Sequence, residues 1–238
     1  MLIPLKVDVP TWRRPWGNYA LICLIVCVSV AGFYNEELFL KLAGIRIHSL
    51  GTLLDPHHAV ELTTEDFPLP VLALTSSLLH GGWLHLIGNM LFLWVFGNAI
   101  NYKFGHLGYL VLYALAAMAG GLAHYAVIST PGVGASGAIN GVMGAFLVFF
   151  PRNDVTVLWV IFIWRLPWVG RISSACLILF YVAWDVLYLA LGVQTNIGVW
   201  AHVTGFLAGF LVALVCASGR WIKPTPDEQT LLQVFRRR

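Results

Sequence analysis

The most constraining feature of the sequence is a series of six apolar runs, each 15 to 22 residues long. Five of them contain no Asp, Glu, Lys or Arg, and the sixth contains only Asp185. A helix needs about 20 such residues to cross a bilayer, with a range of about 17–25. The sequence therefore predicts an all-α polytopic membrane protein, a bundle of six transmembrane helices of which the fourth is short. The runs cover residues 16–34, 82–100, 107–128, 136–150, 173–192 and 197–218.

The composition excludes other classes of protein. Charged residues make up 11% of the chain, against roughly 25% in a typical soluble domain. Hydrophobic residues make up 59%, which is too much apolar surface for a disordered chain. The net charge of +3 is small and dispersed, so we expect no nucleic-acid partner.

The basic residues predict how the chain is oriented in the membrane. Twelve of the 14 Lys and Arg residues fall on one side of a six-span topology, and only Lys41 and Arg46 fall on the other. The excess of Lys and Arg marks the cytoplasmic side, so both ends of the chain are expected there. The predicted organisation is a cytoplasmic segment over 1–15, a membrane domain over 16–218 with a long outer loop over about 35–79, and a cytoplasmic tail over 219–238. We expect the long loop to be structured and partly membrane-associated.

A seventh apolar stretch, residues 155–164, is too short to cross a bilayer as a helix. It carries Trp159 and Trp164, and Trp168 follows, with Arg165 and Arg171 close by. Aromatic and basic residues together are typical of a segment lying in the membrane interface. We therefore expect residues 155–168 to be interfacial.

Polar side chains inside the runs mark the candidate site, because such groups are costly in a bilayer. The second, fourth and sixth runs cross in the same direction, and His85, Asn89, Ser136 and His202 all lie near their outer ends. His80 precedes the second run, where a structural hydrogen bond is the simplest interpretation. A zinc site needs a further ligand, and HExxH is absent from the sequence, so we expect no metal and no cofactor.

Ser136 and His202 are the candidate nucleophile and base. Ser136 follows a glycine-rich segment and opens the fourth run, where a helix N-terminus favours negative charge. A serine in this place is, by itself, more often a helix cap. His202, Gly205 and Gly209 share one helix face, and Gly137 and Gly141 form a matching small-residue face on the fourth run.

Close packing of these two faces would bring His202 to Ser136, which predicts a Ser–His dyad. Asp185 is the one acidic residue inside a run. A structural hydrogen bond is the favoured interpretation of Asp185, and a third catalytic member is the alternative.

These residues, in this order, resemble the rhomboid family of intramembrane serine proteases. The resemblance covers about residues 68–213 and includes H-x4-H-x3-N from His80 to Asn89, G-x-S-G from Gly134 to Gly137, and A-H-x2-G-x3-G from Ala201 to Gly209.

The resemblance implies that Ser136 is the nucleophile and His202 the general base and then general acid. It implies that the His85 and Asn89 side chains and the Ser136 backbone N–H bind the oxyanion. It also implies the bundle of six spans with cytoplasmic ends that is typical of the basic bacterial form, in the bacterial inner membrane.

Supporting roles follow from the same resemblance. It implies that His80 is structural near the outer loop, that Gly134 shapes the loop before the nucleophile, and that Gly205 and Gly209 pack the sixth span on the fourth. Members of the family often have an aromatic residue four positions after the nucleophile, stacked on the catalytic histidine, where this chain has Asn140. We expect the Asn140 amide to bond to an imidazole nitrogen of His202 or to a trapped water.

The predicted function is intramembrane serine endopeptidase, a hydrolase that cleaves the transmembrane segments of membrane proteins within the lipid bilayer. The main alternative is a non-catalytic rhomboid-like protein that binds membrane helices without cutting them. Asn140 favours this alternative, because it stands where members of the family often have an aromatic residue. A small transporter is a second alternative, but the sequence has no inverted repeat of the kind that transporters show.

Overall fold

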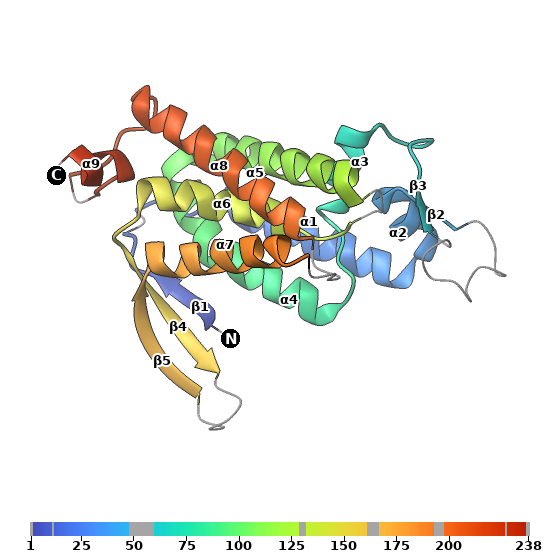
Figure 1. Cartoon of the computed structure of the whole chain (residues 1–238), viewed down its shortest axis with the longest axis horizontal. Helices are drawn as coiled ribbons and strands as arrows, with labels where there is room; N and C mark the ends of the chain where they lie inside the picture. The colour runs from blue at the N-terminus through green and yellow to red at the C-terminus, as the bar shows by residue number, and fades with distance from the viewer. Residues whose placement is uncertain are drawn as a thin grey trace.

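The structure, a computed structural model, describes residues 2–10, 12–47, 60–128, 132–160, 167–192, 198–226 and 228–236. Helices form along the six apolar runs, and two small sheets lie outside them (Figure 1). The helical elements are α1 (Trp16–Tyr34), α2 (Glu36–Ala43), α3 (Leu69–Ser76), α4 (Trp83–Phe92), the π-helical turn η2 (Leu93–Gly97), α5 (Asn98–Ile128), α6 (Ser136–Phe149), α7 (Ser174–Ala190), α8 (Val199–Ser218) and α9 (Leu231–Arg236). The strands are β1 (Leu2–Val7), β2 (Ile45–Ile47), β3 (Val60–Leu62), β4 (Asp154–Val160) and β5 (Pro167–Ser173).

Helix length and composition agree with a protein that crosses a membrane several times. Among the described residues, three helical segments are long and apolar enough to span: α1, the stretch Trp83–Ile128, and α8. Gly105, with a φ of 72°, interrupts the second of these and divides it into two helices. The shorter apolar helices α6 and α7 complete the bundle.

A buried polar cluster joins the first helix to the second and third apolar runs. The Asn18 side chain donates to the Leu93 carbonyl, 3.0 Å away, and to the Asn98 side chain, 2.8 Å away. Tyr109 donates its hydroxyl hydrogen to the Asn18 side-chain oxygen. The π-helical turn begins at Leu93, where the regular helical bond pattern changes and Asn18 supplies a donor. A side chain at Gly97 would place its Cβ 2.7 Å from Asn18 Oδ1, so only glycine leaves room for this cluster.

The all-α prediction was wrong for the segments that form the two sheets of the described residues. β1 pairs with β4, and β4 pairs with β5, all antiparallel, with Trp159 opposite Trp168. Val155 and Val157 are buried and Thr156 between them is less so, which is the two-residue period of a strand. The local sequence conceals this sheet because its third strand, β1, lies far from the other two in the sequence, before the first apolar run. Trp164 and Arg165 lie outside the described residues.

The prediction of a structured loop over 35–79 is confirmed for its described part. α2 and α3 form within this loop, and β2 pairs with β3 between them. Thr75 donates its hydroxyl hydrogen to the Leu42 carbonyl at 2.7 Å, which joins α3 to the end of α2. Residues 48–59 of this loop lie outside the described residues.

α6 is the central helix of the bundle. All of its residues except Ser136 and Asn140 are buried, and α5, α8 and η2 pack around it. An element enclosed in this way has little freedom to shift, because protein interiors are close-packed. The residue that opens α6 is therefore held in a fixed position.

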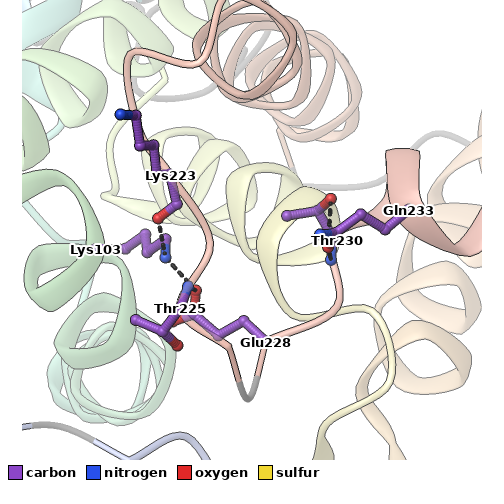
Figure 2. A network of polar contacts seen from close by, with 6 residues as sticks. All are labelled: Lys103, Lys223, Thr225, Glu228, Thr230 and Gln233. Carbon is purple, nitrogen blue, oxygen red and sulfur yellow. Dashed lines mark hydrogen bonds and ion pairs between the residues drawn. The ribbon is translucent and has the colours of Figure 1, made fainter.

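A buried ion pair attaches the C-terminal segment to the bundle (Figure 2). Lys103 contacts Glu228, and their side chains are only 4% and 6% exposed. The Lys103 ammonium also donates to the Lys223 carbonyl at 2.9 Å, and the Glu228 carboxylate accepts from the Thr225 N–H at 2.8 Å. Each buried charge thus has a second partner.

We expect Glu228→Gln to lower the thermal unfolding midpoint in detergent clearly. It leaves the Lys103 ammonium buried without a counter-charge, a loss of about 3–5 kcal/mol for pairs of this kind. The double substitution Lys103→Met with Glu228→Leu should recover part of the midpoint, because it removes both charges. Gln229→Ala is the matched control, since Gln229 bonds to the exposed Arg152 side chain. Equal midpoints for Glu228→Gln and Gln229→Ala would contradict the prediction.

Candidate active site

The candidate nucleophile opens α6 two residues after a glycine with positive φ. Gly134 has a φ of 134°, and a Cβ there would lie 2.8 Å from the His85 ring. Its backbone N–H donates to the Ser76 carbonyl on α3 at 3.1 Å. These features fix the path of the chain into Ser136, the first residue of α6. The first N–H groups of that turn have no partner within the helix, and a helix N-terminus favours negative charge.

Glycine contacts bring α8 against α6. A Cβ on Gly205 would lie 2.1 Å from the Gly137 carbonyl oxygen, and one on Gly209 would lie 2.0 Å from that of Gly141. The two backbones therefore touch along this face, as small residues allow in membrane helices. Gly120 on α5 makes a similar contact, since its Cβ would lie 2.8 Å from the Ala201 carbonyl oxygen. The start of α8 is held from two sides, and His202 is its fourth residue.

Ser136, His202 and Asp185 form a chain of hydrogen bonds across three helices. His202 Nε2 lies 2.8 Å from Ser136 Oγ, and His202 Nδ1 lies 3.1 Å from Asp185 Oδ2. The His202 and Asp185 side chains are both 14% exposed. The two residues of the Ser–His pair expected from the sequence lie within hydrogen-bonding distance of each other. Asp185, for which a hydrogen bond was the favoured interpretation, is bonded to His202. Spacing within one helix carries no information on how α7 is rotated against α8.

His85 and Asn89 lie with Ser136 and His202 around one cavity of about 1020 Å³. Ser136 borders it at the start of α6, and His85 and Asn89 border it from α4. The Asn89 side chain also donates to the His85 carbonyl at 3.1 Å. The structure thus gathers at one cavity the polar residues that the sequence analysis assigned to neighbouring depths.

His80 is fully buried beside this group and does not line the cavity. The Ser29 hydroxyl donates its hydrogen to the Leu78 carbonyl at 2.8 Å. Because that hydrogen is engaged, Ser29 Oγ accepts from the Nδ1–H group of His80 at 2.9 Å. Burial lowers the pKa of His80 to about 3, and the nearby His85 lowers it as well. The neutral His80 imidazole is bonded to Ser29 of α1 and packs edge to face against the His85 ring of α4. It therefore joins these two helices.

Of the two bonds expected for Asn140, the one to an imidazole nitrogen of His202 is not formed. Its amide donates to the Ser136 carbonyl, one turn back on α6, at 2.9 Å. Both nitrogens of the His202 ring are already bonded to Ser136 and Asp185. Asn140 borders the cavity, but its side chain closes a bond within α6 because the imidazole offers it no open position.

The sequence analysis missed one wall of the cavity. Tyr181, Trp184, Asp185 and Tyr188 all line it from α7. Their spacing of i, i+3, i+4 and i+7 is that of a single helix face, and this pattern is the signal that could have found them. An acidic residue within an aromatic helix face indicates a face turned toward other protein groups rather than toward lipid.

Comparison with known proteins identifies the family of the chain. The Rhomboid domain family matches residues 71–219, more than half of the chain, and that range holds Ser136, His202, His85 and Asn89. The chain belongs to the rhomboid family. This rhomboid is therefore a multi-pass integral membrane protein built as a helical bundle.

Several curated relatives share roughly 30% of their residues with this rhomboid over the matched region. It is 31% identical over 147 residues to the putative rhomboid protease YdcA of Bacillus subtilis, covering 60% of this chain and 65% of the relative. It is 32% identical over 147 residues to Rhomboid protein 1, mitochondrial, of Saccharomyces cerevisiae, covering 57% and 39%. It is 32% identical over 140 residues to RHOMBOID-like protein 5 of Arabidopsis thaliana, covering 58% and 41%. The chain spans less than two thirds of the length of each of these relatives.

Proposed function

We propose that this rhomboid is an intramembrane serine endopeptidase that cleaves the transmembrane segments of membrane proteins. The observation that carries the proposal is the 2.8 Å contact between Ser136 Oγ and His202 Nε2, at the start of a buried apolar helix and beside a cavity of about 1020 Å³. A nucleophile within hydrogen-bond reach of a base is the arrangement that acyl transfer requires.

The proposed reaction follows from these atoms. His202 Nε2 takes the Ser136 hydroxyl proton while Oγ bonds to the scissile carbonyl carbon, which forms a tetrahedral oxyanion. The Ser136 N–H and the His85 and Asn89 side chains are the proposed donors to that oxyanion. His202 then gives its proton to the leaving amine as the C–N bond breaks. Water, activated by the same imidazole, hydrolyses the acyl-enzyme and restores Ser136.

The proposed topology has six spans with both ends in the cytoplasm, in a bacterial inner membrane. In support, β1 pairs with β4 and the C-terminal segment pairs with Lys103, so both ends of the chain meet the same end of the bundle (Figure 1). α6 has 14 residues, about 21 Å at about 1.5 Å per residue, against a hydrocarbon core of about 30 Å. If its C-terminal end lies at the inner surface, Ser136 lies below the outer one.

The proposed substrates follow from the same setting. A peptide bond in an intact helix has its carbonyl engaged in the helix, so the cleaved segment should contain residues that unwind it locally, such as Gly or Pro. The aromatic and apolar lining from α4 and α7 suits such a segment better than a charged peptide.

Reconstitution in liposomes with a transmembrane reporter tests the proposal. We expect wild-type protein to cleave the reporter, Ser136→Ala to leave it intact, and a fluorophosphonate to label wild type at Ser136 only. A chelator should have no effect. Cleavage that persists in Ser136→Ala, or that a chelator removes and zinc restores, would overturn the serine mechanism. Absence of cleavage by wild type on a panel of reporters would favour the non-catalytic alternative.

A further inference from the structure

Asp185 places a carboxyl group in the otherwise apolar helix α7, where a charged group is costly unless it has a partner. An acidic residue facing lipid at mid-helix costs on the order of 2.5–3.5 kcal/mol on insertion scales. In the structure its carboxylate faces the bundle, borders the cavity and bonds to His202 Nδ1 at 3.1 Å. We infer that Asp185 is a positioning residue of this rhomboid, and that it holds His202 in the tautomer that activates Ser136. This inference rests on the proposed protease function.

The donor and acceptor properties of the two groups decide the tautomer. An ionised carboxylate can only accept a hydrogen bond, so the nitrogen that faces it, Nδ1, must carry the proton. A neutral imidazole has one proton, and Nε2 is then left with its lone pair. Nε2 is the atom 2.8 Å from Ser136 Oγ. Asp185 on α7 therefore leaves Nε2 of His202 unprotonated, so that this nitrogen can accept the hydroxyl proton of Ser136.

The same contact favours the charged intermediate of the reaction. When Nε2 takes the serine proton, His202 becomes an imidazolium with Asp185 directly behind it. The two side chains are each only 14% exposed, so the attraction between their charges is stronger than in water. The geometry of the pair is in place before the reaction starts. The Asn140 amide is engaged with the Ser136 carbonyl at 2.9 Å, so Asp185 is the side chain that orients the ring at Nδ1.

Asp185→Asn separates this role from simple packing. Asparagine has the same shape and can still bond to Nδ1, so a purely structural hydrogen bond survives the substitution. Its amide hydrogens, however, favour the tautomer with an unprotonated Nδ1 and a protonated Nε2, which cannot accept the Ser136 proton. We expect kcat to fall by roughly 10²- to 10³-fold, with KM within about threefold of wild type, because the loss is confined to the chemical step.

The experiment measures kcat, KM, fluorophosphonate labelling and thermal unfolding for wild type, Asp185→Asn, Ser136→Ala and Thr204→Val. Thr204→Val is the matched control, because it removes a hydrogen bond within α8, from Thr204 to the Trp200 carbonyl, close to His202 but outside the cavity. Labelling of Ser136 should slow in Asp185→Asn as kcat does, with the unfolding midpoint unchanged. If Asp185→Asn does not fold, Asp185→Ala takes its place in the same assays.

Two outcomes would overturn the inference and leave the proposed function standing. One is a folded Asp185→Asn whose kcat stays within about threefold of wild type while Ser136→Ala is inactive. The other is a rise in KM with kcat unchanged, which would assign Asp185 to substrate binding. Cleavage retained in Ser136→Ala would instead overturn the proposed function itself.

Discussion

His202→Ala is expected to reduce the kcat for cleavage of a transmembrane reporter by roughly 10⁴-fold or more, as much as Ser136→Ala does. The reason is that the serine hydroxyl is a weak nucleophile until His202 Nε2, 2.8 Å away, takes its proton. Without the imidazole, no described side chain is hydrogen-bonded to Ser136 Oγ in its place. Both variants should insert in the membrane and unfold near the wild-type temperature, because neither substitution touches the α6–α8 glycine contacts.

The double substitution makes this prediction sharper. Nucleophile and base act as one unit, so Ser136→Ala with His202→Ala should be no slower than either single variant. The measurement is reporter cleavage in liposomes over long incubation, with product bands quantified for all four proteins. Additive losses would contradict the prediction, because they would mean that His202 and Ser136 act in separate steps.

Gly209→Ala is expected to destabilise the bundle by about 3 kcal/mol, at the upper end of what overpacking usually costs. The added Cβ would lie 2.0 Å from the Gly141 carbonyl oxygen, which is backbone at the centre of the molecule and cannot turn aside. Either α8 moves away from α6, or the helices stay together under strain. Separation would also lengthen the Ser136–His202 contact, so activity should fall together with stability.

Gly108→Ala is the matched control for this prediction. Gly108 is also helical, and a Cβ there would meet the Phe104 side chain at an ordinary 3.4 Å. Alanine favours a helix over glycine by about 1 kcal/mol, so the control should unfold at or slightly above the wild-type temperature in detergent. Equal unfolding midpoints for Gly209→Ala and Gly108→Ala would show that the α6–α8 contact is looser than the structure places it.

The membrane class, the helical runs and the Ser136–His202 pair were within reach of the sequence alone. Uncharged runs near 20 residues long permit few structures other than spanning helices, because every backbone polar group in a bilayer must be bonded internally. The glycines at Gly205 and Gly209 share one face because helical spacing is regular. Local rules of this kind depend on residues within a few turns of each other, which is the range that a sequence pattern covers.

Tertiary structure decided the rest. The β1–β4–β5 sheet needs one strand from before the first apolar run and two from between the fourth and fifth runs. The Lys103–Glu228 pair joins residues 125 positions apart. The partner of Asp185 depends on how α7 is rotated against α8, and the bond made by Asn140 depends on which imidazole nitrogens are already occupied. The sequence alone determined that Asp185 needed a partner, because a charge in lipid is costly. Only the packing of three helices determined that this partner is His202, because distances between helices are not encoded in the spacing along any one of them.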